Sequence, residues 1–267
     1  MTDRLRRDQA PLTEAAWELI DEEAGRALRH FLTARALVDF TGPKGWSHSV
    51  EAQGRVEPAA SPVTGVEVRT RVVTPLVESR TAFTLSRAEL DAVERGLRSP
   101  DLDAVTDAAR RAAEVEDRAV FGGGPGGSGG IAASSPHEAV TISDDYSEYP
   151  RHVASAVARL RRAGVEGPYG IALGDRCYTG VIETTERGGY PVLEHVRLIL
   201  GGPVVWAPAV DGALVVSMRG GDYELVSGAD FAVGYSRHTD TDVELYLEES
   251  FAFLVHEPGA AVPLRYS

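Results

Sequence analysis

Residues 122–136 form a glycine-rich segment, GGGPGGSGGIAASSP, whose spacing could support two kinds of chemistry. The first is a dinucleotide-binding loop, because Gly122, Gly124 and Gly127 have its glycine spacing. Such a loop holds a pyrophosphate against backbone N–H groups between a strand and the start of a helix. Here the preceding residues predict a helix and no helix start follows, so we expect no dinucleotide site.

The second kind is nucleophilic catalysis, because Gly126, Ser128 and Gly130 fit the G-x-S-x-G nucleophile elbow. That elbow needs a strand before the serine, a helix after it and a histidine base downstream. The strand is missing, and the neighbouring glycines leave the hydroxyl unpositioned. The segment is more typical of a flexible loop that joins two subdomains.

Metal-binding spacings are absent from the sequence. It contains no H-E-x-x-H, no H-x-x-x-H and no Glu-x-x-His, which excludes the di-iron signature of ferritin-like bundles. Asp144 with Asp145 and Asp240 with Asp242 could hold a cation, but the second pair lies in a predicted turn, where aspartates bond to the local backbone. We therefore predict no metal and no resident cofactor.

Composition and charge limit the class and the partners. The 267 residues are 43% hydrophobic and 25% charged, as in a globular chain of one or two domains, and the one cysteine, Cys177, excludes an internal disulfide. No signal-like run and no stretch of about 18 apolar residues occurs, so we expect a cytoplasmic chain without a membrane span. A net charge of −13 opposes binding to phosphates, so we expect no nucleic-acid partner.

Three helices are predicted in the first half of the chain. Thr13 caps the first, whose apolar stripe alone fits docking on the chain's own core. Residues 80–124 predict two more, of which the second begins near Pro100 with Ser99 as its cap. The narrow, alanine-rich face of that helix predicts close packing against a sheet: Leu102, Val105, Ala109, Ala112, Ala119 and Val120.

A long hairpin is predicted between residues 41 and 83, where side chains alternate on either side of a PAASPVTG turn. It carries Pro58 and Pro62 near its tip and has few large apolar residues. Because an isolated hairpin is only marginally stable in water, it needs a partner surface. That surface is either the chain's own sheet or a neighbouring subunit.

The rest of the chain mixes helices and strands, which makes the class α+β. The predicted elements are helices over residues 150–163 and 175–182 and strands over 169–173, 204–206, 214–217 and 223–226. Residues 243–255 alternate as a long strand with one buried face. With Phe231, Val233 and Tyr235 ahead of a turn, this strand predicts a sheet that packs on the alanine-rich helix.

Several stretches occur in the order typical of one family: APLTEAAWELID, TAFTLSRAELDAVERG, AAEVEDRAVFGG, VEGPYGIAL, GGYPVLEHV, VWAPAVDGALVVSMRGGDYEL and VGYSRHTDTDVELYLEESFAF. They cover nearly the whole chain. The sequence thereby resembles the encapsulins of family 1, linocin-like (bacteriocin-like) nanocompartment shell proteins that are similar to tailed-phage major capsid proteins.

The resemblance implies the phage capsid fold of the Hong Kong phage type. The implied parts are an N-terminal arm with a lumen-facing helix (1–42), an extended hairpin arm (43–83), a peripheral domain (84–133 with 227–267) and an axial domain (134–226). It favours the neighbouring subunit as the partner of the hairpin, in an icosahedral homo-oligomer of about sixty copies. The chain is then a shell subunit and not an enzyme.

The resemblance also implies that the shell encloses a cargo enzyme, such as a dye-decolourising peroxidase or a ferritin-like protein, through the cargo's C-terminal peptide. An apolar strip that ends in charged residues suits a short tail. The positions that match the peptide groove are Leu28, Phe31, Leu32, Arg35, Asp39, Phe231, Val233 and Tyr235.

A polar loop matches the family's fivefold pore loop, although the sequence alone favours an ordinary surface turn. Its residues are Glu186, Arg187, Gly188, Gly189 and Tyr190, and the opposite charges of the first two leave the sign of the pore potential open. Some encapsulins carry a tryptophan associated with bound flavin where this chain has Arg87, which argues against a flavin cofactor.

An alternative function remains for the chain as a free subunit. It would be a hydrolase that uses Ser128, or a bacteriocin-like toxin, and it would act as a small oligomer. Particle mass distinguishes this alternative from a shell.

Overall fold

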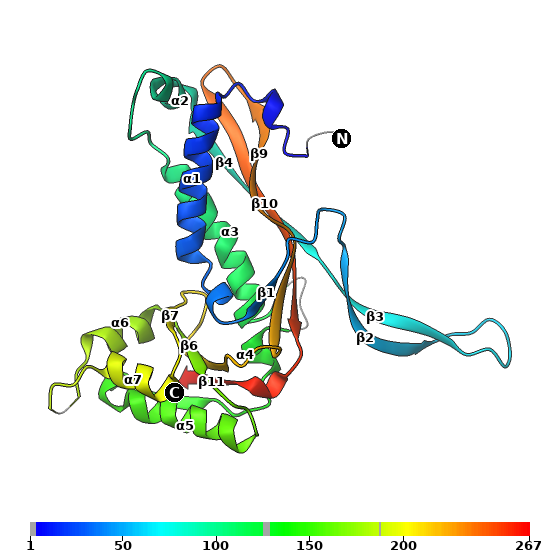
Figure 1. The fold of residues 1–267 in the computed structure, drawn as a ribbon, viewed down its shortest axis with the longest axis vertical. Helices are drawn as coiled ribbons and strands as arrows, with labels where there is room; N and C mark the ends of the chain where they lie inside the picture. The colour runs from blue at the N-terminus through cyan, green and yellow to red at the C-terminus, as the bar shows by residue number, and fades with distance from the viewer. Residues whose placement is uncertain (1–3, 125–128, 187) are drawn as a thin grey trace.

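The computed structural model describes residues 4–124, 129–186 and 188–267 (Figure 1). The helices are α1 (Glu14–Phe31), α2 (Arg87–Glu94), α3 (Asp103–Phe121), α4 (Ile131–Ser134), α5 (Tyr149–Arg162), α6 (Asp175–Glu183) and α7 (Val192–Leu200). The strands are β1 (Asp39–Thr41), β2 (Val50–Ala59), β3 (Val68–Pro75), β4 (Val77–Ser86), β5 (Val140–Ile142), β6 (Tyr169–Leu173), β7 (Val204–Trp206), β8 (Ala213–Ser217), β9 (Tyr223–His238), β10 (Asp242–Val255) and β11 (Ala261–Tyr266).

The strands of the described residues form three sheets. One has the order β1-β9-β10-β4, the second has the order β5-β11-β8-β6-β7, and β2 pairs only with β3. Helices α1 and α3 lie side by side along the first sheet, while α5, α6 and α7 lie with the second at the opposite end of the molecule (Figure 1). The predicted α+β class is therefore confirmed.

Each of the two larger sheets has its own core. In the core of the four-stranded sheet, α3 contributes small side chains. Ala108, Ala109 and Ala113 are fully buried beside Ile20 of α1 and Leu245 of β10. Because alanine lets a helix backbone approach closely, the alanine-rich face allows α3 to pack on the sheet and on α1 together. This confirms the predicted packing of that helix.

The two longest helices begin in different ways. Thr13 caps α1 as predicted, since its Oγ1 accepts a hydrogen bond from the Ala16 N–H at 3.3 Å. The prediction that α3 begins near Pro100 with Ser99 as cap was wrong, because α3 begins at Asp103 without a side-chain cap. Asp101 instead accepts a hydrogen bond from the Asp103 N–H at 3.1 Å in the preceding turn.

Strand β10 is buried on both faces over most of its length, whereas the alternation predicted only one buried face. Part of its second face is covered by the N-terminal segment. Arg4 Nε lies 2.6 Å from Glu248, which is 2% exposed, and the Arg4 carbonyl accepts a hydrogen bond from the Tyr246 hydroxyl at 3.4 Å. A segment so distant along the chain could not be placed from the alternation alone.

Strand β9 is one continuous element where two shorter strands were predicted. It runs beside β10 through both cores, with Leu225 in the core of the five-stranded sheet and Val233 in the core of the four-stranded sheet. At the end of the chain, β11 pairs with β5 and β8. Residues 261–266, which the expected peripheral domain includes, thus lie in the five-stranded sheet with β5 to β8. Helix α7 was not predicted.

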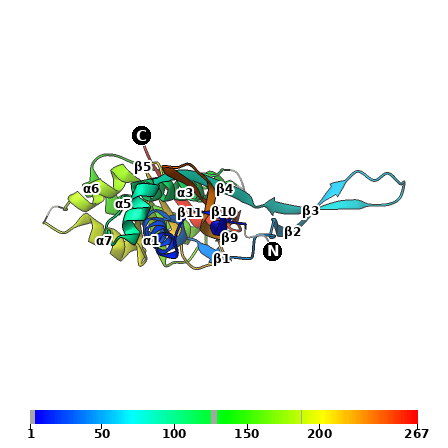
Figure 2. The same ribbon diagram turned by 90° about the horizontal axis from the view of Figure 1, so that it is seen from above.

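The hairpin of β2 and β3 extends away from both cores (Figures 1 and 2). It is antiparallel, with a register shift between Ala52 and Val56. Its base is held by bonds close to the body, including that from the Leu76 N–H to the Ser49 carbonyl at 2.9 Å. The predicted two-stranded hairpin is therefore confirmed, and the structure does not pair it with the subunit's larger sheets.

Candidate functional site

Arg35 lies at the centre of an ion-pair cluster just beyond the end of α1. Its guanidinium donates two hydrogen bonds to the Glu116 carboxylate of α3, at 2.8 and 2.6 Å. A further bond joins it to Asp230 of β9 at 2.9 Å, and Glu249 of β10 lies 3.9 Å away. The side chains of Glu116 and Glu249 are 0% and 1% exposed. Arg35 therefore links the end of α1 to α3 and to both central strands.

The same guanidinium lies over two aromatic rings. Its carbon lies 4.5 Å from the ring centroid of Phe40 and 5.5 Å from that of Phe231. Contacts within about 6 Å of a ring centroid are attractive cation–π contacts. Because Phe40 is 38% exposed, this arrangement presents an apolar surface to solvent on top of a charged base.

Burial changes the proton affinity of the carboxyl groups in and beside the cluster. It raises the pKa of Glu249 well above its ordinary value, and the neighbouring Glu116 raises that pKa further, because a second negative charge beside Glu116 is unfavourable. Burial also raises the pKa of Asp117 to about 6, although three hydrogen bonds from Thr33 and Ala34 act in the opposite direction.

The raised pKa of Asp117 predicts higher stability at mildly acidic pH. An acid whose pKa is about 6 when folded and near 3.8 when unfolded binds more protons in the folded state, so stability falls as pH rises between these values. The shift is equivalent to about 3 kcal/mol. Thermal unfolding should therefore need a higher temperature near pH 5 than near pH 7.5, and Asp117→Asn should reduce that difference. An undiminished difference in this variant would assign the effect to other groups.

The predicted groove residues divide into accessible and buried sets. Phe31, Leu32 and Phe231 are partly exposed and pack at the edge of the core of the four-stranded sheet. Leu28, Val233 and Tyr235 are 8%, 2% and 7% exposed, so they belong to the core of the single subunit. We call Phe31, Leu32, Phe40 and Phe231 the helix-end surface.

Asp39 does not join the Arg35 cluster. It lies in β1, is exposed, and its Oδ2 accepts a hydrogen bond from the Gly221 N–H at 2.6 Å. Gly221 has a φ of 78°, a conformation that favours glycine, so Asp39 fastens a tight turn. The charged partners of Arg35 are Glu116, Asp230 and Glu249, none of which was predicted.

The loop from Glu186 to Tyr190 joins α6 to α7, at the end of the molecule that holds the five-stranded sheet (Figure 1). Glu186 accepts a hydrogen bond from the Gly189 N–H at 2.9 Å, and its carboxylate lies 2.7 Å from Nδ1 of His195. Gly188 and Gly189 have positive φ values of 119° and 81°, and Tyr190 is 46% exposed. Arg187 lies outside the described residues.

The glycine-rich segment is flanked by helices. α3 precedes it, as predicted, but α4 begins at Ile131, so the prediction that no helix start follows was wrong. Gly126, Gly127 and Ser128 lie outside the described residues. What is described before the serine is a helix and not the strand that a nucleophile elbow needs.

Asp144 and Asp145 are bonded to other groups of the chain. Asp144 bonds to Arg176, and Asp145 caps a turn by accepting a hydrogen bond from the Ser147 N–H at 3.1 Å. Within the described ranges no group of three or more His, Cys, Asp or Glu side chains could hold a metal ion. In the same ranges no helix is long and apolar enough to cross a membrane. Cys177 is buried and its Sγ lies 3.1 Å from the Tyr266 hydroxyl.

Solved structures with low sequence identity share this fold. A virus-like particle protein of Pyrococcus furiosus superposes with a TM-score of 0.63 at 16% identity, covering 90% of this chain and 97% of that one. The capsid of Myoviridae phage XM1 superposes with a TM-score of 0.53 at 12% identity, covering 86% of this chain and 90% of that one. The predicted phage capsid fold is thereby confirmed.

Sequence comparison places the chain more narrowly. The Linocin_M18 family, described as "Encapsulating protein for peroxidase", matches residues 1–252. A type 1 encapsulin shell protein of Rhodospirillum rubrum is 48% identical over 98% of this chain and 96% of its own length. Another, from Mycolicibacterium paratuberculosis, is 44% identical over 97% of this chain and 98% of its own. The chain therefore belongs to the type 1 encapsulin shell proteins, and its role is structural rather than enzymatic.

Proposed function

We propose that about sixty copies of this chain assemble into a closed icosahedral cage that captures a cargo enzyme by its C-terminal peptide. The observation that carries the assembly is the hairpin of β2 and β3. It projects from the body (Figure 2) and exposes apolar side chains that its own subunit does not cover. These are Val50, Val56, Val63, Val66, Val68 and Val73, which are 36% to 57% exposed.

An exposed hairpin of this length needs a partner. Two strands without a further layer are marginally stable in water. Covering the exposed valines with another surface contributes about 25 cal/mol of stabilising free energy per Å² of apolar area buried. A neighbouring copy supplies that surface. In each copy residues 84–133 and 227–267 form the peripheral domain, residues 134–226 form the axial domain, and α1 belongs to the N-terminal arm (1–42). The shell tolerates nuclease, because a chain with net charge −13 has little attraction for nucleic acid.

Particle size tests the assembly. The purified protein should elute as a multi-megadalton particle, appear as hollow spheres by electron microscopy, and keep its size after nuclease treatment. A monomer or small oligomer, or particles that collapse with nuclease, would contradict the proposed cage.

The cargo's peptide docks on the helix-end surface. Its four side chains offer apolar area, and two of them, Phe40 and Phe231, lie against the guanidinium of Arg35. An apolar surface next to a charged cluster suits a short apolar tail that ends in a polar group. The family description names a peroxidase, which we propose as the cargo here. The loop from Glu186 to Tyr190 lines the pore at the fivefold axis, where copies of Tyr190 and of the glycines meet.

Phe31→Asp with Leu32→Asp should abolish cargo loading while shells still form. Each change removes apolar area and adds a carboxylate that docking must desolvate, and a loss of about 1.4 kcal/mol already weakens binding tenfold. Loading is measured as fluorescence per shell with a tail-bearing fluorescent reporter. Leu19→Asp is the control, because Leu19 is a half-buried leucine of the same helix far from its end. Normal loading in the double variant would exclude the helix-end surface.

A further inference from the structure

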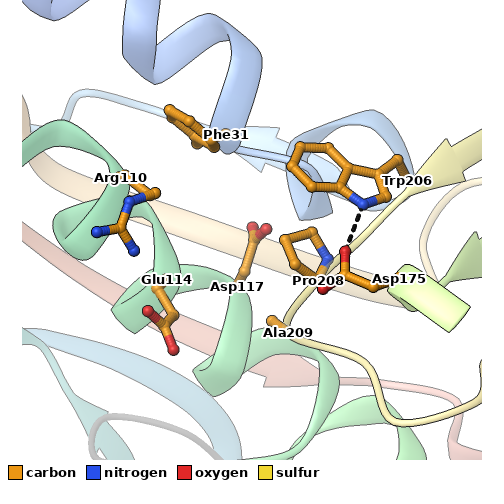
Figure 3. A pocket seen from close by; sticks show the side chains of 8 residues that line it. All are labelled: Phe31, Arg110, Glu114, Asp117, Asp175, Trp206, Pro208 and Ala209. Carbon is orange, nitrogen blue, oxygen red and sulfur yellow. Dashed lines mark hydrogen bonds between the residues drawn. The ribbon is translucent and has the colours of Figure 1, made fainter. Parts of the chain in front are cut away.

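A cavity of about 360 Å³ adjoins the helix-end surface (Figure 3). Phe31, the last residue of α1, lines both the surface and the cavity. Trp206 of β7 packs beside Phe31, with a centroid distance of 6.4 Å and an angle of 53° between the two rings, so the two side chains form one aromatic wall of the cavity. The Trp206 Nε1 donates a hydrogen bond to Asp175 Oδ1 at 2.7 Å, which fixes the indole beside the start of α6.

The charges around the cavity are unbalanced. Three carboxylates line it, from Glu114, Asp117 and Asp175, against one guanidinium, Arg110. Asp117 is occupied by donors from Thr33 and Ala34, and Glu114 is paired with a neighbour on α3. Asp175 is different: one of its oxygens holds the indole, and the other has no donor among the described residues.

An acidic cavity with an aromatic wall selects one class of ligand. A cation over an aromatic face within about 6 Å is attracted to it, and a nearby carboxylate adds to that attraction. Arg110 lies on the opposite side of the cavity from Trp206, with its guanidinium 3.4 Å from Asp107, so it does not occupy the face of Trp206 or the second oxygen of Asp175 (Figure 3).

We propose that this cavity binds the charged end of a lysine or arginine side chain in the cargo's C-terminal tail, over the face of Trp206 and against the second carboxylate oxygen of Asp175. The proposal rests on the proposed function, because the tail is placed on the helix-end surface. Phe31 belongs to both sites, so a tail that packs on it brings its next side chain to the cavity. The cavity thus adds a charge preference to an otherwise apolar docking surface.

Loading of matched tails tests the preference. Three reporter tails should differ at one position after the apolar residues, carrying lysine, methionine or glutamate. In wild-type shells the lysine tail should load about fivefold better than the methionine tail, and the glutamate tail should load worst. Asp175→Asn, which keeps an oxygen for the indole, should remove the lysine advantage without changing loading of the methionine tail.

The control is Asp211→Asn, an equal change of charge at an exposed aspartate that does not line this cavity. It should keep the full lysine advantage. An advantage that survives Asp175→Asn, or that is lost equally in Asp211→Asn, would overturn the proposed pocket because the effect would then be one of general charge.

A second experiment tests the cavity with a small cation and without any cargo tail. Benzylammonium should bind purified empty shells in calorimetric titration, and benzyl alcohol should bind at least about tenfold more weakly. Trp206→Leu should abolish benzylammonium binding while shell size is unchanged. Absence of benzylammonium binding to wild-type shells would overturn the cation pocket. Binding of benzylammonium with no loading of any tail would instead refute the docking of tails and leave the cation pocket supported.

Discussion

Arg35→Ala is expected to destabilise the subunit by about 3–5 kcal/mol, because removing one partner of a buried ion pair leaves an uncompensated buried charge. Glu116 is fully buried and Glu249 nearly so, and Arg35 is the cation bonded to the first and closest to the second. The same change releases the rings of Phe40 and Phe231 from their contact with the guanidinium. Urea denaturation followed by circular dichroism measures the loss, with light scattering to separate disassembly from unfolding.

Two further variants identify the cause. Arg151→Ala removes an arginine whose side chain is 82% exposed and paired with Glu148, so it should cost no more than about 0.5 kcal/mol. Arg35→Met combined with Glu116→Gln should restore much of the stability, because a buried pair can be replaced by neutral groups at little cost. An Arg35→Ala protein as stable as Arg151→Ala would mean that the cluster is neutralised by protons alone.

Deleting residues 57–65, the tip of the hairpin, should abolish assembly and leave the subunit folded. The deleted residues are almost all exposed and contribute to neither core, so their removal costs the single subunit little. In the shell the same residues cover a neighbour, and the loss recurs at every copy. Size-exclusion chromatography and circular dichroism should show small, folded species instead of particles.

A milder variant complements the deletion. Val56→Lys with Val68→Lys keeps the hairpin's length while it removes two exposed apolar contacts, so assembly should weaken rather than stop. Ser61→Lys places the same charge near the tip and serves as control. Deleted chains that still form shells of normal stability would show that assembly depends on other surfaces.

Local patterns predicted most of the elements. The Thr13 cap, the alternation of the hairpin and the strand at Tyr169–Leu173 involve residues close together in sequence, and the structure has these features where they were predicted. Long-range cover was not predictable in the same way. Part of the second face of β10 is covered by Arg4, which lies near the other end of the sequence.

The two buried carboxylates of the ion-pair cluster could have been recognised from the sequence. Glu116 falls on the alanine-rich face of α3, four residues after Ala112, and Glu249 falls between Leu247 and Phe251 on the buried face of β10. A carboxylate within a buried pattern needs a partner, so each position predicts a cation nearby. Which arginine supplies it depends on tertiary packing. The same holds for Trp206 and Phe31, whose proximity follows from how the two sheets are placed.

Strand β11 has a consequence for the order in which the subunit folds. It lies inside the five-stranded sheet, between β5 and β8, although residues 261–266 are far along the chain from residues 140–142 and 213–217. Sheets that depend on such distant pairings form late and slowly, because a long loop must close before the contacts are made. The five-stranded sheet is therefore expected to be completed only when β11 docks, after local elements such as the hairpin of β2 and β3 have formed.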